Sequence, residues 1–241
     1  MQQGLIEVRD LKKAYVRGRE TVEALRGVSL SIAPGEFVSV MGPSGCGKST
    51  LLHLIGGIDR PSGGTVRVND TDVSAASEDA LTRFRRDHVG FIFKFYNLLP
   101  TLSALENVEL PLIALKYPRQ ARRKMARAAL DLVGLADRAT HRPAELSGGQ
   151  QQRVAIARAL VSNPKVILAD EPTGDLDSAS ARMVVDIMRE LNRDLGLTFV
   201  VVTHNPDVGA AGTRIIRLRD GQVVGDEPTG SAHPNRKVAD S

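Results

Sequence analysis

Short, mostly apolar runs alternate along this chain with longer stretches of mixed polarity. Four such runs lie at residues 37–41, 89–93, 166–169 and 199–203. Their length and their content of Val, Ile, Leu and Phe are typical of buried strands. The first run leads through a glycine-rich turn into residues 48–57, whose pattern predicts a helix. This alternation predicts an α/β domain with a largely parallel sheet.

The pattern changes after residue 93. Helical spacing predicts three helices, at residues 105–115, 119–133 and 150–160. We therefore expect a helical subdomain at 94–159, inserted into a core formed by residues 1–93 and 160–225. Residues 226–241 are rich in Pro, Gly, Ser and charge without periodicity, which predicts a disordered tail.

The composition of the 241 residues is that of an ordinary globular protein, with 42% hydrophobic and 25% charged residues. No apolar stretch approaches the roughly 20 residues that span a bilayer. The first residues also lack the pattern of a signal peptide. The single cysteine, Cys46, excludes an internal disulfide and suits a reducing compartment. These features together predict a cytoplasmic protein.

Basic side chains outnumber acidic ones, 32 to 28, which gives a net charge of +4. A basic surplus raises the question of nucleic acid binding. No basic motif interleaved with aromatic residues accompanies it, so we expect no nucleic acid partner. The densest basic stretch, residues 116–127, is predicted to form one helix with a solvated charged face. Contact of that face with a partner is the alternative.

A phosphate-binding loop follows the first predicted strand. Its residues Gly42, Ser44, Gly45, Cys46, Gly47, Lys48, Ser49 and Thr50 fit the pattern G-x-x-x-x-G-K-S and its continuation. Glycines allow backbone N–H groups to converge on phosphate oxygens at a helix N-terminus. Lys48 is placed to reach the β- and γ-phosphates, and the Ser49 hydroxyl to bind Mg²⁺. The loop alone does not distinguish a kinase, a GTPase and an ATPase.

Polar residues end two later strands. Asp170 and Glu171 follow the run 166–169, and His204 follows the run 199–203. Asp170 is a candidate for holding Mg²⁺ through water, and Glu171 for polarising a water molecule against the γ-phosphate. His204 lies at the sheet edge where ligands of α/β sheets bind, and is predicted to contact the γ-phosphate. The alternatives are that Asp170 and Glu171 form an ordinary acidic turn and that His204 is merely solvated. The presence of a phosphate-binding loop in the same chain disfavours both alternatives.

The segment Ser147-Gly148-Gly149-Gln150 carries a second phosphate-binding pattern. Ser147 and Gln150 form a capping box, so the segment begins a helix whose bare N–H groups suit an anion. The segment and the helix that follows resemble the signature of ABC ATPases, and the resemblance extends over residues 4–225. It implies a mostly parallel core sheet, an antiparallel β part and an inserted helical subdomain.

The resemblance also implies a mechanism. Ser147 to Gln150 would contact the γ-phosphate held by a second copy, so that two chains enclose two ATP molecules head to tail. Tyr15 matches the aromatic residue that stacks on adenine. Asp177 matches the loop that couples the two sites. Glu171, His204 and Lys48 would be the catalytic residues.

Three segments, 17–23, 54–61 and 96–108, resemble a subgroup of these ATPases that serves lipoprotein release, macrolide export and cell division. Members pair with membrane permeases that have few spans and a large extracytoplasmic domain. The resemblance implies a subunit on the inner face of the cell membrane that drives a separately encoded permease. The alternative is an ABC ATPase acting on ribosomes or DNA. It is disfavoured because the chain has no room for a second cassette or a long arm.

One residue departs from the family pattern. Lys94 stands where the family usually carries glutamine, whose carbonyl oxygen approaches Mg²⁺ and the attacking water. Lysine has three donors and no acceptor, so it cannot bind Mg²⁺ while protonated. We therefore expect Lys94 to turn outward and hydrolysis to be slower or more dependent on a partner. A neutral role in a mobile loop is the alternative.

Overall fold

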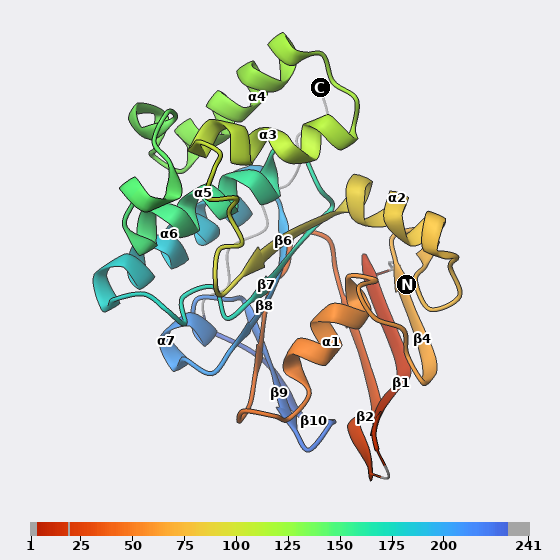
Figure 1. Ribbon diagram of the computed structural model, residues 1–241. Helices are drawn as coiled ribbons and strands as arrows, with labels where there is room; N and C mark the ends of the chain where they lie inside the picture. The colour runs from red at the N-terminus through yellow and green to blue at the C-terminus, as the bar shows by residue number, and fades with distance from the viewer. Residues whose placement is uncertain (1–3, 19, 231–241) are drawn as a thin grey trace, which may run out of the picture.

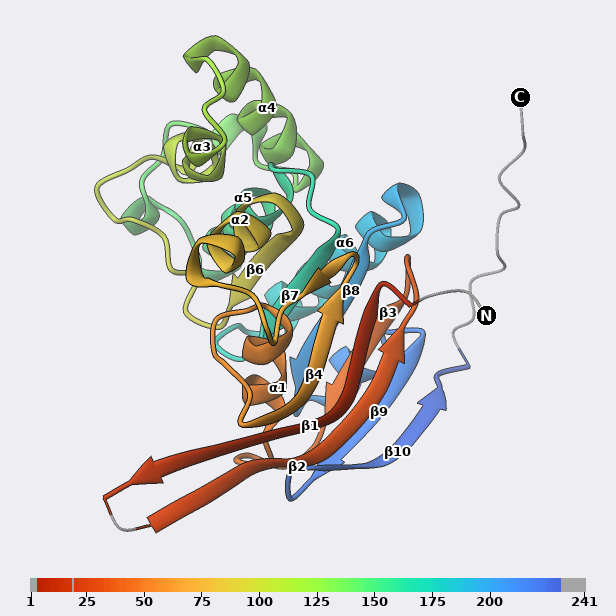
Figure 2. The same ribbon diagram turned by 90° about the vertical axis from the view of Figure 1, so that its right-hand side faces the viewer.

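Two β-sheets with helices between and above them form the part of the chain that the computed structural model describes, residues 4–18 and 20–230 (Figure 1). The smaller sheet has the order β2-β1-β4-β5 and is antiparallel. Its strands are β1 (Ile6–Arg17), β2 (Glu20–Ile32), β4 (Gly63–Val68) and β5 (Thr71–Asp72). The paired ends of β1 and β2 project beyond the rest of the molecule (Figure 2).

The larger sheet has the order β10-β9-β3-β8-β7-β6. Its strands are β3 (Phe37–Met41), β6 (Val89–Phe93), β7 (Val166–Asp170), β8 (Thr198–Thr203), β9 (Arg214–Arg219) and β10 (Gln222–Pro228). All neighbours are parallel except β9 and β10. The four predicted strands are therefore present, side by side and parallel. Because they are parallel, their carboxyl ends meet at one edge, where Phe93 pairs with Asp170.

The helices are α1 (Lys48–Ile55), α2 (Glu78–His88), α3 (Ala104–Ala114), α4 (Arg119–Leu132), α5 (Gly148–Leu160), α6 (Ser178–Leu195) and α7 (Pro206–Gly209). The predicted helices at 105–115, 119–133 and 150–160 correspond to α3, α4 and α5. Helix α5 starts two residues earlier than predicted, because the Ser147 hydroxyl accepts from the Gln150 N–H and caps the helix at Gly148.

Two hydrophobic cores lie on the two faces of the larger sheet. Ile167 and Ala169 of β7 face the core shared with α3, α4 and α5, whereas Val166 and Leu168 face the core shared with α1 and the smaller sheet. This alternation follows from the period of two along a strand. Helix α1 touches strands of both sheets. Helices α3 and α4 lie together at one end of the molecule (Figures 1 and 2).

The predicted tail begins too early. Strand β10 continues to Pro228, with Asp226 paired to Ile216 and Pro228 to Arg214. The Arg214 guanidinium binds the Asp226 carboxylate at 2.6 Å and holds the pKa of that carboxyl below its usual range. This ion pair keeps residues 226–228 in the sheet, whereas residues 231–241 of the predicted tail lie outside the described residues. In residues 4–18 and 20–230, which the structure describes, none of the helices has the length and apolar character of a membrane span.

Candidate functional site

The phosphate loop connects β3 to α1 and is packed tightly from two directions. Gly47 has φ +101°, and a Cβ there would collide with the carbonyl oxygen of Ala24 in β2. A Cβ at Gly42 would collide with the carbonyl oxygen of Leu218 in β9. Glycine is therefore required at both positions. Gly45, by contrast, has open space around its Cβ position, as expected where a ligand approaches the backbone.

The start of α1 is left open to a ligand. Its N-cap residue, Gly47, has no side-chain hydrogen bond to the helix. The backbone N–H groups of Lys48 and Ser49 make no hydrogen bond to another described residue. The Lys48 ammonium donates to the carbonyl oxygens of Gly42 at 2.8 Å and Pro43 at 2.9 Å, so it lies across the mouth of the loop. Open N–H groups, a helix dipole and a lysine fit a nucleoside triphosphate.

The strand-end residues lie beside this loop. The Ser49 hydroxyl donates to Asp170 at 2.9 Å, which joins the phosphate loop to the end of β7. A hydroxyl and a carboxylate are the oxygen donors that Mg²⁺ takes alongside phosphates and water. The described residues contain no group of three His, Cys, Asp or Glu side chains able to hold a metal on its own. The pair therefore fits a Mg²⁺ that arrives with a nucleotide.

Glu171 and His204 form a second pair at the same edge. The His204 Nδ1 and the Glu171 Oε1 are 2.8 Å apart. Glu171 has φ +48°, in the left-handed region that a glutamate seldom adopts. Its N–H donates to the Val202 carbonyl, and its own carbonyl accepts from Gly174, so both neighbouring segments hold this conformation. Such strain is typical of functional positions.

The signature segment lies elsewhere on the chain. Ser147 and Gln150 form the predicted capping box at the start of α5. Gly148 and Gly149 face the Tyr96 hydroxyl and Ser180, respectively, and no hydrogen bond in the described part of the chain joins this segment to the phosphate loop. Asp177 caps α6, and hydrogen bonds from Ser180 lower the pKa of its carboxyl.

Tyr15 is anchored at its hydroxyl. The hydroxyl donates to Asp59 at 2.8 Å, and the Lys13 ammonium, itself bound to Asp59 at 2.7 Å, lies 4.7 Å from the ring centroid. Burial and the hydrogen bond to Asp59 raise the pKa of Tyr15 above its ordinary value. Asp59 and Lys13 were not among the predicted site residues. The resemblance of the segment 54–61 was a signal for Asp59, and nothing in the sequence indicated Lys13.

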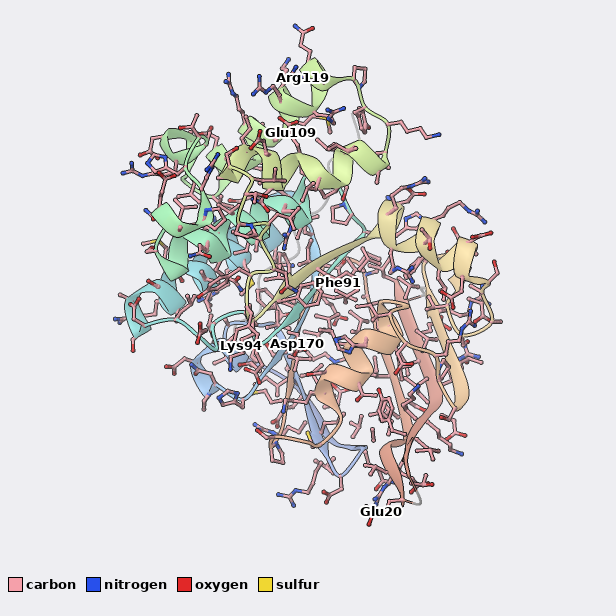
Figure 3. All side chains as sticks on the ribbon, in the orientation of Figure 1. Glu20, Phe91, Lys94, Glu109, Arg119 and Asp170 are labelled. Atoms are coloured by element: carbon pink, nitrogen blue, oxygen red, sulfur yellow. The ribbon has the colours of Figure 1, made fainter. Side chains whose placement is uncertain are left out.

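Lys94 directly follows Phe93, which pairs with Asp170 at the carboxyl ends of the strands (Figure 3). Its side-chain carbons run alongside Gly174, and its ammonium lies 5.3 Å from the Phe95 ring centroid. It forms no ion pair within the described ranges 4–18 and 20–230. Phe95 is itself exposed, whereas Lys94 is half-buried, so the outward orientation of Lys94 stays a prediction.

Two buried amides, Gln152 and Asn107, were not predicted from the sequence. The Nε2 of Gln152, on α5, donates to the carbonyls of Phe93 at 3.3 Å and Pro172 at 2.6 Å. Gln152 thereby ties α5 to the segments before Lys94 and after Glu171. Asn107, on α3, bonds three carbonyls and one N–H in residues 99–103. A polar residue on the apolar face of a predicted helix was the available signal.

A groove of about 440 Å³ lies next to these residues. It is lined chiefly by β6, the C-terminal half of α3, and α5, including Phe91, Phe93, Pro111, Ala114 and Ala159. The Arg158 guanidinium holds one wall by donating to the carbonyls of Tyr96, at 2.7 Å, and Asn97. Burial lowers the pKa of Arg158. The groove is mostly apolar and open on one side, which suits a protein segment.

Comparison with known proteins identifies the family. The family model described as ABC transporter matches residues 25–174. The chain belongs to the ABC transporter family. It is an ATP-binding cassette with the ATPase domain of that family, and its fold is the one expected from the signature.

Relatives of two kinds match this ABC cassette. The macrolide export ATP-binding/permease protein MacB of Sodalis glossinidius is 50% identical over 244 residues, which cover 97% of this chain and 37% of that protein. An uncharacterised ABC transporter ATP-binding protein of Thermotoga maritima is 50% identical, covering 94% and 96%. The cassette therefore spans about a third of the first relative and nearly all of the second.

A solved structure matches as well. The ATP-binding cassette MJ0796, in a dimeric post-hydrolysis state bound to ADP and Pi, has a TM-score of 0.86 and 48% sequence identity, covering 93% of this cassette and 98% of that chain. MJ0796 is a protein of Methanocaldococcus jannaschii.

Proposed function

We propose that this cassette closes as a head-to-tail dimer around two ATP molecules with Mg²⁺ and drives a separate membrane permease by hydrolysis. One observation carries the proposal. The phosphate loop, Asp170, Glu171 and His204 meet at one sheet edge, whereas the second phosphate-binding segment begins α5 and makes no described contact with them. One chain therefore has no signature segment beside its own phosphate loop, and the segment of a second copy would complete the site.

Each residue at the edge has a separate task. Open N–H groups in the loop from Gly42 to Thr50, among them those of Lys48 and Ser49, hold the phosphates together with the Lys48 ammonium. Ser49 and Asp170 would hold Mg²⁺, which neutralises phosphate charge when bound. Glu171 accepts a proton from the attacking water on its carboxylate, and His204 fixes that carboxylate through Nδ1 and faces the γ-phosphate.

The remaining predicted residues act at the ligand's other end or across the dimer. Tyr15 offers its ring to adenine. Ser147, Gly148, Gly149 and Gln150 bind the γ-phosphate of the opposite site with the open helix start. Asp177 holds the turn before α6 and connects the two sites through Ser180, which faces Gly149 in the same chain.

The permease docks in the groove between β6, α3 and α5. The groove is mostly apolar, although Arg85, Arg86 and Arg158 also line it. Phe93 lines the groove and Lys94 follows it, so docking and the proposed catalytic edge share one segment. A MacB relative carries the words ATP-binding and permease in one name, which supports a membrane partner. We further propose a permease with few spans and a large extracytoplasmic domain, and a cytoplasmic cassette on the inner membrane face.

The test combines two variants with opposite expectations. Glu171→Gln keeps the shape and the contact with His204 but loses the base, so hydrolysis should fall by roughly 10²–10⁴-fold and an ATP-bound dimer should accumulate. Lys48→Ala should lose nucleotide binding and stay monomeric. Size-exclusion chromatography with saturating ATP and Mg²⁺ measures both. A Glu171→Gln chain that remains monomeric would contradict the dimer mechanism.

The same Glu171→Gln chain, tagged, tests the partner. Recovery of a stoichiometric multi-span protein from native membranes would support the permease. Recovery of ribosomal or DNA-bound partners alone would contradict it.

A further inference from the structure

Helix α4 presents a basic surface that the nucleotide site does not use. Lys116, Arg119, Lys124 and Arg127 are all exposed and have no ion pair among the described residues. Arg119, Lys124 and Arg127 lie on α4, whereas Lys116 lies in the turn before it at φ +60°, so the helix predicted over 116–127 begins only at Arg119. We call these four residues the α4 basic face. Figure 3 shows nitrogen-bearing side chains around the labelled Arg119 at the end of the molecule that α3 and α4 form. The one carboxylate of α4 is Asp131, in its last turn.

The basic face is not explained by the needs of the helix. Cations are disfavoured near a helix N-terminus, which is already positive. Helix α4 nevertheless has Arg119 in its first turn, no acidic residue there and no side-chain cap. The attachment of α4 to α3 uses other residues, since Arg122 and Arg123 lie 3.7 and 3.6 Å from the buried carboxylate of Glu109. Arg119 thus destabilises the start of α4 and does not help to pack it against α3. A residue that breaks a local rule in this way indicates a function.

Apolar side chains continue the surface. Ile113 is 50% and Tyr117 is 42% exposed, at the turn that leads from α3 into α4. A tyrosine and an aliphatic side chain beside several cations are the composition of surfaces that touch a bilayer interface. Surfaces that bind single-stranded nucleic acid instead present several aromatic residues among the cations along a binding path, whereas this surface has one, Tyr117, and α4 itself contains none.

The position of this surface next to the groove indicates that it faces the membrane. Pro111 and Ala114 line the proposed permease groove, and Lys116 and Tyr117 follow directly on the same chain segment. A permease that enters the groove comes from the membrane, so the neighbouring surface faces the lipid headgroups. This step rests on the proposed function.

We propose that the α4 basic face, with Ile113 and Tyr117, is a contact surface for the anionic headgroups of the membrane. Each cation near such a surface contributes about fivefold to the partition coefficient, and the attraction falls off within a Debye length. The contact would orient the cassette beside its permease and raise its local concentration there.

Co-sedimentation of the full chain with vesicles tests this surface. Vesicles of equal parts phosphatidylcholine and phosphatidylglycerol should bind the chain, and phosphatidylcholine vesicles should not. Replacing Arg119, Lys124 and Arg127 with alanine should lower binding by roughly a hundredfold. Alanine favours helix, so α4 should remain folded. The double change Arg119→Lys and Arg127→Lys should keep binding, because charge is preserved.

A matched control removes the same charge elsewhere. Arg9→Ala, Arg26→Ala and Arg219→Ala change exposed residues of β1, β2 and β9, and should leave vesicle binding intact. Equal binding by the α4 variant and this control would overturn the proposal, as would α4-dependent binding to duplex DNA without binding to vesicles. Failure of the unmodified chain to bind phosphatidylglycerol vesicles, with normal Glu171→Gln dimers and permease capture, would overturn this inference alone and leave the proposed function standing.

Discussion

Replacing Asn107 with alanine should both destabilise the cassette and impair docking. Asn107 is fully buried, and its amide oxygen accepts from the Leu99 N–H at 2.7 Å. Its nitrogen donates to the carbonyls of Leu99, Leu102 and Ser103 at 3.0–3.2 Å. Two protons are shared among these three carbonyls, so we count three full hydrogen bonds in all. Their loss should cost roughly 3 kcal/mol of unfolding free energy.

Thermal unfolding followed by far-UV circular dichroism measures the cost, since the chain has no tryptophan. A loss of that size corresponds to a fall in Tm of roughly 6–12 °C for a domain of this length. Capture of the permease should fall at the same time, because residues 99–103 follow Asn97 in the groove wall.

Asn192 provides a matched control at a distance from the groove. Its amide nitrogen donates to the carbonyls of Gly35 at 2.9 Å and Leu197 at 2.6 Å, and it is also buried. Asn192→Ala should lose roughly 2 kcal/mol and keep permease capture when assayed below its Tm. An Asn107→Ala chain that is as stable as the unmodified one, or that docks no worse than Asn192→Ala, would refute the reasoning.

Three further predictions concern the nucleotide site. Lys94→Gln should raise basal phosphate release by up to about tenfold, roughly 1.4 kcal/mol of barrier, because glutamine supplies an acceptor. Lys94→Met removes the charge without adding an acceptor, and an equal rise there would assign the effect to charge alone. Asp59→Asn should weaken ATP binding several-fold in calorimetry, because the anchor of Tyr15 is weakened. Tripolyphosphate binding should be unchanged, and an equal loss for both ligands would exclude a role in base recognition. Cys46 is buried, so a thiol reagent should react slowly with the native chain and fully in denaturant, and fast inactivation of the native chain would contradict the packing.

The sequence predicts those strands whose local pattern of apolar residues matches their burial in the structure. The parallel strands are buried on both faces and therefore read as continuous apolar runs, as in Phe37 to Met41. Strand β10 alternates exposed and half-buried residues and ends in Pro228, so nothing local distinguishes it from a polar tail. Its stability comes from Arg214, twelve residues away, and a distant ion pair leaves no periodic signal.

The same distinction applies to the site. A phosphate-binding loop is constrained by its backbone geometry, so its residues follow a fixed spacing in the sequence, as Gly42 and Lys48 do. Residues that position other segments follow no fixed spacing in the sequence. Gln152 and Asn107 act on carbonyls, which every residue possesses, so their partners cannot be read from residue types.

The packing around the phosphate loop also determines when the loop can form during synthesis. Gly47 rests against Ala24, Gly42 against Leu218, and the Cys46 carbonyl accepts from the N–H of Gly221. A nascent chain that ends before residue 221 lacks the hairpin on which the loop leans, although every residue of the loop has been made. Closing contacts between such distant parts of a chain is slow. We therefore expect nucleotide binding to be acquired late in synthesis, and a chain that stops before β10 to bind nucleotide weakly or not at all.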